Sequence, residues 1–420
     1  MSDVPIAALR RIIAAMTPHR RILHDLVNLP TAPFVEQQVI AYIRDFVGRR
    51  PALSIAPDRF GNLLVSYDPR RARRAASQKR QSTKPRSAVR PVLFAAHMDH
   101  PGFLAGRRLD AKHIQAEWNG WVMASFFKGT AVRFFSEGRW VRGKITEVIR
   151  ETPPKGGSRR AAVGARNVPA DNPPSGVIVR VEGPVEPGSP GMWDLPDAVV
   201  KDNRIHCRVC DDLAGLAAIL AMLDAICRKP MTTKTYAFFT RAEEVGFAGA
   251  LCAVADKTVP RDCVVVAVEN SKAIAGVSLG AGPVLRVGDK ASVFTPAATA
   301  YCQVAAEALA ARDKSFVFQR KLMDGGTCES TAYCHYGYEA TGICLPLGNY
   351  HNMDLERKRI APEFVDVRDY DNLVKWFIVL AQAPATQPYD GSHPGLDKRL
   401  DGLLKKHRPR LLAGAKVKRQ

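Results

Sequence analysis

The sequence of 420 residues lacks the features that would place it in a membrane or outside the cell. It contains no run of about 18 apolar residues, which excludes a membrane-spanning helix of ordinary length. Its first residues, MSDVPIAALRRII, lack the basic start, the apolar stretch and the small-residue cleavage site of a secretion signal. We therefore expect a cytoplasmic protein with no membrane partner.

Cysteine pairs are also scarce, although the chain has nine cysteines. In the absence of a secretion signal, scattered cysteines are more typical of free thiols than of a disulfide framework. The only close pair is Cys207 and Cys210, and a structural zinc site would need a second such pair. We interpret these two residues as core thiols.

Acidic residues are almost absent from two segments that hold most of the net charge of +20. Residues 70–90 contain nine basic residues and no acid, and residues 398–420 contain nine basic residues and one acid. The rest of the chain is therefore close to neutral. Both segments are typical of a surface loop and a tail. This distribution suits solubility or weak attraction to polyanions better than a dedicated nucleic-acid surface, so a nucleic-acid partner is not expected.

The order of apolar segments predicts an α/β fold. Outside residues 104–206, short buried strands alternate with helices, which favours a three-layer sandwich with a mostly parallel central sheet. The predicted strands are 92–96, 235–240, 263–269 and 340–347, and the predicted helices are 6–16, 19–28, 33–50, 213–226, 297–312 and 363–382.

A different texture marks residues 104–206, where short apolar runs such as WVMASFF (121–127) alternate with Gly, Pro and charged turns. This pattern predicts an inserted all-β domain, with a loop at 151–175. The expected organisation has four parts. They are a first catalytic part (1–103, with the basic loop 70–90), the β insert (104–206), a second catalytic part (207–385) and a basic tail (386–420).

Polar residues at the predicted strand ends are the candidates for chemistry, because α/β sheets bind their ligands there. In FAAHMDHPGF, His97 and Asp99 share one face of an extended chain, and a carboxylate beside an imidazole can orient a metal ligand. Asp211 and Asp212 precede a very apolar helix. One Asp would serve as a helix cap, but a second near a buried helix is costly unless a cation compensates for it.

Three further carboxylates and a second histidine complete the candidate set. Glu243 and Glu244 directly follow a buried strand, where one could coordinate a metal while the other moves protons, although a surface helix cap is an alternative reading. Glu269 ends another strand, and His351 closes a loop after a further one. Nitrogen and oxygen ligands without thiolates suit zinc, cobalt or manganese. Two divalent metal ions, each of them Zn or Co and possibly Mn, fit the count if one carboxylate bridges.

The order of these motifs resembles the dimetal (zinc) aminopeptidases of the glutamyl, deblocking and tetrahedral-assembly type, which are related to the two-zinc carboxypeptidases and deacylases. The similar segments run from about residue 28 to 380 and include AAHMDHPGF, CRVCDDLAGLAAIL, FFTRAEEVGFAGA, VAVENS, DGGTCESTA and GNYHNMD. The resemblance implies a metallo-aminopeptidase that hydrolyses short peptides. It also implies a homo-oligomer formed through residues 104–206.

The same resemblance implies a role for each matching residue. His97 and Glu269 would complete the first metal site, and Glu244 and His351 the second. Asp211 would bridge both metals, with a cis peptide before Asp212. Asp99 would orient His97, and Glu243 would be the general base.

Two positions depart from the family pattern. Glu269 stands where these aminopeptidases usually have Asp, and GGTCES (325–330) replaces GGTDA, so that Cys328 and Glu329 are the candidate residues of the substrate cleft. These departures leave a carboxypeptidase or a deacylase on the same scaffold as an alternative. A non-catalytic module that binds polyanions through the two basic segments is a third possibility.

Overall fold

The computed structural model describes residues 16–75, 90–150, 171–385, 387, 389–391 and 393–415. Its largest element is an eight-stranded mixed sheet in the order β1-β2-β12-β3-β13-β16-β14-β15. The strands are β1 (Leu53–Pro57), β2 (Leu63–Tyr67), β3 (Val92–His97), β12 (Thr235–Thr240), β13 (Val264–Lys272), β14 (Val284–Asp289), β15 (Gln319–Met323) and β16 (Glu339–Leu347).

The four central strands, β12, β3, β13 and β16, are mutually parallel. They are continuous apolar runs, as expected of strands that are buried on both faces. Every residue of β3 and of β12 is buried. Because the strands are parallel, their carboxyl ends lie along one edge of the sheet, and the chain leaves the core there.

Helices cover both faces of this sheet. Phe94 and Ala96 of β3 belong to a large apolar core with α2 (Pro18–Leu26), α3 (Gln37–Gly48), α5 (Leu213–Arg228), α7 (Pro296–Arg312) and α9 (Val367–Gln382). Leu93 and Ala95, which alternate with them along the strand, belong to a second core with α6 (Ala248–Ala255) and α8 (Glu329–His335). Alternate side chains of β3 therefore pack against helices on opposite faces of the sheet.

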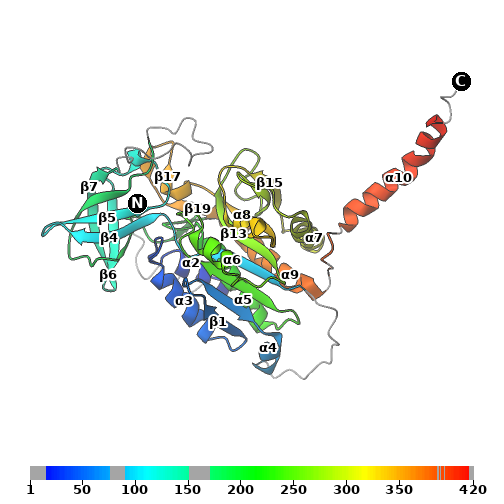
Figure 1. Ribbon diagram of the computed structural model, residues 1–420, viewed down its shortest axis with the longest axis horizontal. Helices are drawn as coiled ribbons and strands as arrows, with labels where there is room; N and C mark the ends of the chain where they lie inside the picture. Colours follow the sequence, from blue (N-terminus) through cyan, green and yellow to red (C-terminus); the bar gives the residue numbers. More distant parts are fainter. Residues whose placement is uncertain are drawn as a thin grey trace.

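A closed six-stranded barrel lies to one side of the sheet (Figure 1), in the order β4-β5-β8-β7-β6-β9. Its strands are β4 (Gly102–Arg108), β5 (His113–Asn119), β6 (Ala131–Ser136), β7 (Arg139–Ile149), β8 (Gly176–Val181) and β9 (Pro190–Trp193). Its core is aromatic: Phe103 contacts Trp118 and Trp193 at ring-centroid distances of 4.7 and 5.1 Å. The barrel thus has an apolar core distinct from that of the sheet.

Several further elements are short. A three-stranded sheet is formed by β10 (Val199–Lys201), β11 (Arg204–Cys207) and β19 (Glu363–Asp366), and a two-stranded one by β17 (Met353–Asp354) and β18 (Arg359–Ile360). The short helices are α4 (Pro69–Ala75), η1 (Ala124–Phe126), η2 (Tyr350–Asn352) and η3 (Ala383–Ala385). No helix among the described residues is long and apolar enough to cross a membrane.

Several sequence predictions need correction. The run 121–127 contains η1 and no strand, and the predicted helix 363–382 begins as strand β19 before α9 starts at Val367. The basic tail contains a long helix, α10 (Pro394–Ala415), which projects from the body in Figure 1. Its leucines recur at helical spacing, and this periodicity indicates a helix although the segment is strongly basic. The start of the basic loop forms α4, whereas the predicted helix 6–16 and most of the loop 151–175 lie outside the described residues.

Candidate metal centre

The edge formed by the carboxyl ends of the central strands gathers the polar residues. His97 is the last residue of β3, Glu269 lies on β13, and Glu243 follows β12. His351 lies in η2, just beyond β16, and Asp211 precedes α5. Five segments that are distant in the sequence therefore meet at one place, as the strand-end argument predicts. The peptide bond between Asp211 and Asp212 is cis, as the resemblance implies.

The side chains form two overlapping groups with the composition of metal sites. One is His97, Asp211 and Glu269, and the other is Asp211, Glu244 and His351; within each group the ligand atoms lie within 4.8 Å of one another. Asp211 belongs to both. Its Oδ1 lies 3.5 Å from Nε2 of His97, and its Oδ2 lies 3.8 Å from Nε2 of His351. A carboxylate placed between two imidazoles can bridge two cations.

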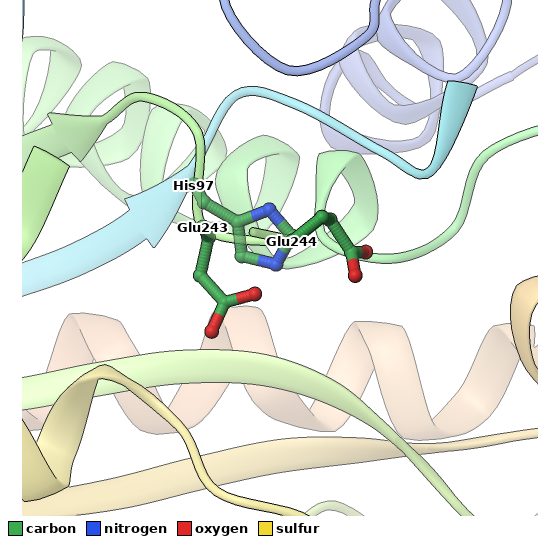
Figure 2. A group of neighbouring side chains, drawn as sticks. All are labelled: His97, Glu243 and Glu244. Atoms are coloured by element: carbon green, nitrogen blue, oxygen red, sulfur yellow. The ribbon is translucent and has the colours of Figure 1, made fainter. Parts of the chain in front are cut away.

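The other ligand distances are similar. Nε2 of His97 lies 3.9 Å from Oε2 of Glu269, and Nε2 of His351 lies 3.2 Å from Oε2 of Glu244. The carboxylate of Glu269 thus reaches His97. Glu243 lies beside this group, because its carboxylate also falls within 4.8 Å of His97 and Glu244 (Figure 2).

The proton equilibria of the centre are strongly perturbed. Burial, reinforced by the negative charge of Glu269, raises the pKa of Glu243 well above its ordinary value. Burial likewise raises the pKa of Glu269 to about 8. Burial opposes a charge on His351, but the neighbouring Glu244 outweighs it and raises the pKa of this imidazole to about 9. Such an acidic cluster is unfavourable by itself and favours cations.

Hydrogen bonding at the centre is incomplete. Oδ1 of Asp211, Oε1 of Glu244 and Nε2 of His351 are buried and lack a hydrogen-bond partner among the described residues. The 3.2 Å approach of His351 to Glu244 does not have hydrogen-bond geometry. Buried polar atoms are normally satisfied, so unpartnered oxygen and nitrogen atoms that converge on one point fit a metal site. The donor set of two imidazoles and several carboxylates is the one that zinc and its neighbours accept.

Asp99 contacts the loop that carries Glu243 and Glu244 as well as His97. Its Oδ1 accepts a hydrogen bond from the backbone N–H of Glu243 at 2.9 Å, and its Oδ2 accepts one from the N–H of Glu244 at 3.1 Å. Nδ1 of His97 lies 3.5 Å from the same carboxylate and 3.1 Å from the backbone carbonyl of Asp99. One buried carboxylate therefore fixes the loop that carries both glutamates and also orients the histidine.

Glu363, which the sequence did not indicate, binds the backbone of two segments that carry candidate ligands. It is fully buried, and its Oε2 accepts the backbone N–H of Cys210 at 2.7 Å and that of Asp211 at 3.2 Å. Its Oε1 accepts the N–H of His351 at 2.8 Å. This carboxylate holds two candidate ligands in position through their backbones. No local motif surrounds it in the sequence, so nothing there could have indicated it.

Other supporting contacts were also missed. Nδ1 of His351 hydrogen-bonds to the carbonyl oxygen of Trp121 at 2.6 Å, which leaves Nε2 facing the carboxylates. His100 contacts the carbonyl oxygen of Asp211 at 2.7 Å, and Nδ2 of Asn270 donates to Oδ1 of Asp212 at 2.8 Å. His100 belongs to the motif AAHMDHPGF, so a second histidine close to the first was the only available signal.

A cavity of about 100 Å³ adjoins the centre and is lined by Asp211, Glu243, Glu244 and Glu269. Cys328 also lines it. Glu329 does not: its side chain is buried at the start of α8, and burial raises its pKa to about 7. Of the two candidate cleft residues, only Cys328 therefore faces this cavity.

Fold and site together define a metal-dependent hydrolase of the α/β type. A sequence model of the M42 glutamyl aminopeptidase family matches residues 80–375, and the chain belongs to this family of metal-dependent aminopeptidases. The family resemblance drawn from the motifs is thus confirmed. No protein of curated function matches the sequence.

Solved structures share the fold. TET1 peptidase of Pyrococcus horikoshii, described as assembling into a tetrahedron or a large octahedral shell, is 19% identical, with a TM-score of 0.64 over 86% of this chain and 99% of its own. An aminopeptidase of Desulfurococcus kamchatkensis is 19% identical, with a TM-score of 0.64 over 87% and 96% of the two chains. An M18-family aminopeptidase of Thermotoga maritima is 11% identical, with a TM-score of 0.56 over 89% and 97%.

Proposed function

We propose that this chain removes N-terminal residues from short peptides at a centre of two divalent metal ions. The observation that carries the proposal is the sharing of Asp211 between two ligand groups, with Glu243 beside them. His97, Asp211 and Glu269 would hold one ion, and Asp211, Glu244 and His351 the other. Zinc or cobalt, and possibly manganese, suits these ligands.

The metal ions would supply a water of lowered pKa and polarise the scissile carbonyl. Glu243 is the general base: it takes the proton from the attacking water and delivers it to the leaving amine. Asp99 supports this role because its hydrogen bond to the N–H of Glu243 fixes the start of the loop.

The family supports attack at the amino end, because the chain belongs to the M42 glutamyl aminopeptidases. The small cavity is lined by Asp211, Glu244 and Glu269, which would hold the metal ions, by the base Glu243, and by the cations Lys272 and Arg286. The cleaved bond would therefore lie close to the peptide end that enters this cavity. Together these observations favour an aminopeptidase over a carboxypeptidase.

We also propose the finer architecture. The sheet with its two helical layers forms a three-layer catalytic sandwich from residues 1–103 and 207–385, and the barrel within 104–206 is an inserted domain. The assembly of the Pyrococcus horikoshii relative supports a homo-oligomer, for which the barrel domain is our proposed interface. Residues 386–420 form a basic appendage. Sedimentation of the purified protein as a monomer alone would overturn the oligomer.

The test compares two adjacent glutamates. The protein is loaded with zinc or cobalt and given peptides with free termini, a blocked N-terminus or a blocked C-terminus. We expect stepwise loss of residues from free N-termini. Glu243→Gln should lower kcat by roughly 100- to 10,000-fold while both metals stay bound, whereas Glu244→Gln should lose one metal. Unchanged hydrolysis by Glu243→Gln would refute the proposal.

The same mixture tests the alternatives. Cleavage from free C-termini only would move the protein to the carboxypeptidases, and release of the blocking acyl group only would move it to the deacylases. Absence of both cleavage and bound metal would favour the non-catalytic, polyanion-binding module.

A further inference from the structure

A second, larger cavity opens beside the metal centre. Its volume is about 1420 Å³, and it lies between the barrel, the sheet β10-β11-β19 and the strand ends of the central sheet. It shares Lys272, Gly325 and Tyr350 with the small cavity at the metal centre. A peptide whose amino end occupies the small cavity would therefore extend into the large one, which we call the outer cleft.

The acidic residues of the outer cleft are mostly neutralised by neighbouring arginines. Asp197 accepts a hydrogen bond from Arg208 at 2.6 Å, and Asp354 lies 3.2 Å from Arg357 and 3.5 Å from Arg359. Glu356 is the one lining acid with no ion pair to a described residue. The pairs therefore contribute little negative potential, so other lining residues decide the sign of the cleft.

Four lining cations have no such partner. Lys272, Lys290, Lys201 and Arg204 are exposed, and none forms an ion pair with a residue in the described part of the chain. Two of them act on His206, another lining residue: burial lowers its pKa, and Arg204 and Lys201 lower it further. The described residues that line the outer cleft therefore carry a net positive charge.

Two of these cations stand where the cavities join. Lys272 is the last residue of β13, three positions after the candidate ligand Glu269, and it lines both cavities. Lys290 follows β14, and its backbone N–H donates to the carbonyl oxygen of Gly326 at 3.0 Å. Gly325 lines both cavities, so the two lysines flank the segment over which a substrate would pass.

We propose that Lys272 and Lys290 bind a carboxylate on the product side of the scissile bond, so that the enzyme prefers short peptides with a negative charge downstream of the cleaved residue. This inference rests on the proposed aminopeptidase activity and names its substrate class. The metal centre would act at the amino end of the peptide, and the basic cleft attracts a carboxylate farther along it, so a short peptide with that charge is bound in the productive orientation. The carboxylate can be the C-terminus itself or an acidic side chain.

The experiment measures kcat/KM for tripeptide pairs that differ only in the downstream charge. Ala-Ala-Ala is compared with its C-terminal amide, and the amide of Ala-Ala-Asp with the amide of Ala-Ala-Asn. We expect the charged member to be favoured by about threefold to tenfold, which is typical of two partly exposed cations. Preference in the first pair alone identifies the C-terminus as the recognised carboxylate, and preference in both identifies the charge itself. Equal rates in both pairs overturn the proposal.

Variants assign the preference to the two lysines. In Lys272→Ala/Lys290→Ala the ratio between charged and uncharged members should fall to about one, and Lys272→Arg should keep it. Lys257→Ala is the matched control, because Lys257 is an exposed lysine after α6 and does not line either cavity. A ratio that survives in the double variant overturns the assignment.

A binding measurement separates this inference from the proposed activity. The dipeptide Ala-Ala and its amide are titrated into the metal-loaded Glu243→Gln variant, in which hydrolysis is suppressed, and calorimetry reports binding. Tighter binding of the free acid, lost in the double variant, supports the inference even if no peptide is cleaved. Equal affinity refutes it whether or not cleavage occurs.

Discussion

The carboxylate of Asp99 accepts a hydrogen bond from the backbone N–H of Glu243 at 2.9 Å. The residue just beyond β3 therefore fixes the residue just beyond β12. Strand β3 brings Asp99 to this point, and β12, its parallel neighbour, brings Glu243. The proposed base is therefore positioned through its backbone, while its side chain stays available for proton transfer. Asp99→Asn places an N–H₂ group where the carboxylate now accepts hydrogen bonds.

We expect Asp99→Asn to lower kcat/KM by about 10- to 100-fold, the usual effect of losing a group that orients a metal ligand. The measurement is peptide hydrolysis at fixed metal content, with elemental analysis to confirm that content. Asp45→Asn, which removes an exposed charge paired with Arg49, is the control and should leave the rate unchanged. Full activity of Asp99→Asn would show that the loop keeps its position without this carboxylate.

Glu363 offers a second test of backbone support. Glu363→Gln replaces one carboxylate oxygen with an NH₂ group, which cannot accept a hydrogen bond. The N–H groups of Asp211 and His351, which bond to different oxygens, therefore cannot both stay satisfied. We expect metal affinity to fall by about 10- to 100-fold. Competition with a chromogenic chelator measures it. An affinity equal to that of the unaltered protein would mean that these N–H groups find other partners.

Metal removal should destabilise the folded protein, because the ligand carboxylates then face one another without cations. A ligand at 100 times its Kd stabilises by about 2.7 kcal/mol. Two such ions together contribute about 5 kcal/mol, so we expect the Tm of a chain of this length to fall by about 5 °C when a chelator strips the protein, and to recover when zinc is added back. The Glu244→Gln variant should show a smaller drop. An unchanged Tm, with metal loss verified by elemental analysis, contradicts the prediction.

Asp371 links α9 to α2 and makes stability depend on pH. Oδ1 accepts from Nε2 of His19 at 3.0 Å, and Arg20 binds the other oxygen. Burial opposes its charge, but the bonds to His19 and Arg20 outweigh burial and lower the pKa of Asp371 below its ordinary value of 3.8. The folded state therefore holds fewer protons than the unfolded state, and this contribution is present above pH 3.8 and lost as the pH falls through the lowered pKa.

Asp371→Asn should lower the free energy of unfolding by about 1 kcal/mol at pH 7, with the difference shrinking below pH 3.8. Urea unfolding of both proteins across that range measures it. Asp45→Asn, whose exposed side chain is paired only with Arg49, should show almost no difference at either pH. A loss that is independent of pH would assign the effect of Asp371 to packing.

Removal of residues 394–420 tests the basic appendage. The leucines of α10 that the structure describes are 44% to 56% exposed, so they bury little apolar surface. We expect the Tm to change by less than about 2 °C, and peptide hydrolysis to be unchanged. A large loss of stability would indicate that α10 packs against another copy of the chain in solution.

The sequence by itself determined the sheet, the family and the candidate ligands. The buried strands 92–96, 235–240, 263–269 and 340–347 are continuous apolar runs. The polar residues at their ends or in the loops that follow are conspicuous because burying them would be costly. The ligand types and their order along the chain then favoured two metals. Their assignment as ligands stays a prediction, although the structure brings all of them to one edge.

The tertiary structure alone decided what surrounds those residues. Glu363 holds two ligand segments from a strand with no local motif, and Asp99 binds the backbone of Glu243 across 144 positions of sequence. The basic outer cleft exists because Lys272 and Lys290 come together with β11 and the barrel edge. Such contacts depend on how strands pair and how two separate cores pack. Neither can be deduced from a local sequence pattern, because hydrophobic periodicity and secondary-structure propensity describe one helix or strand at a time.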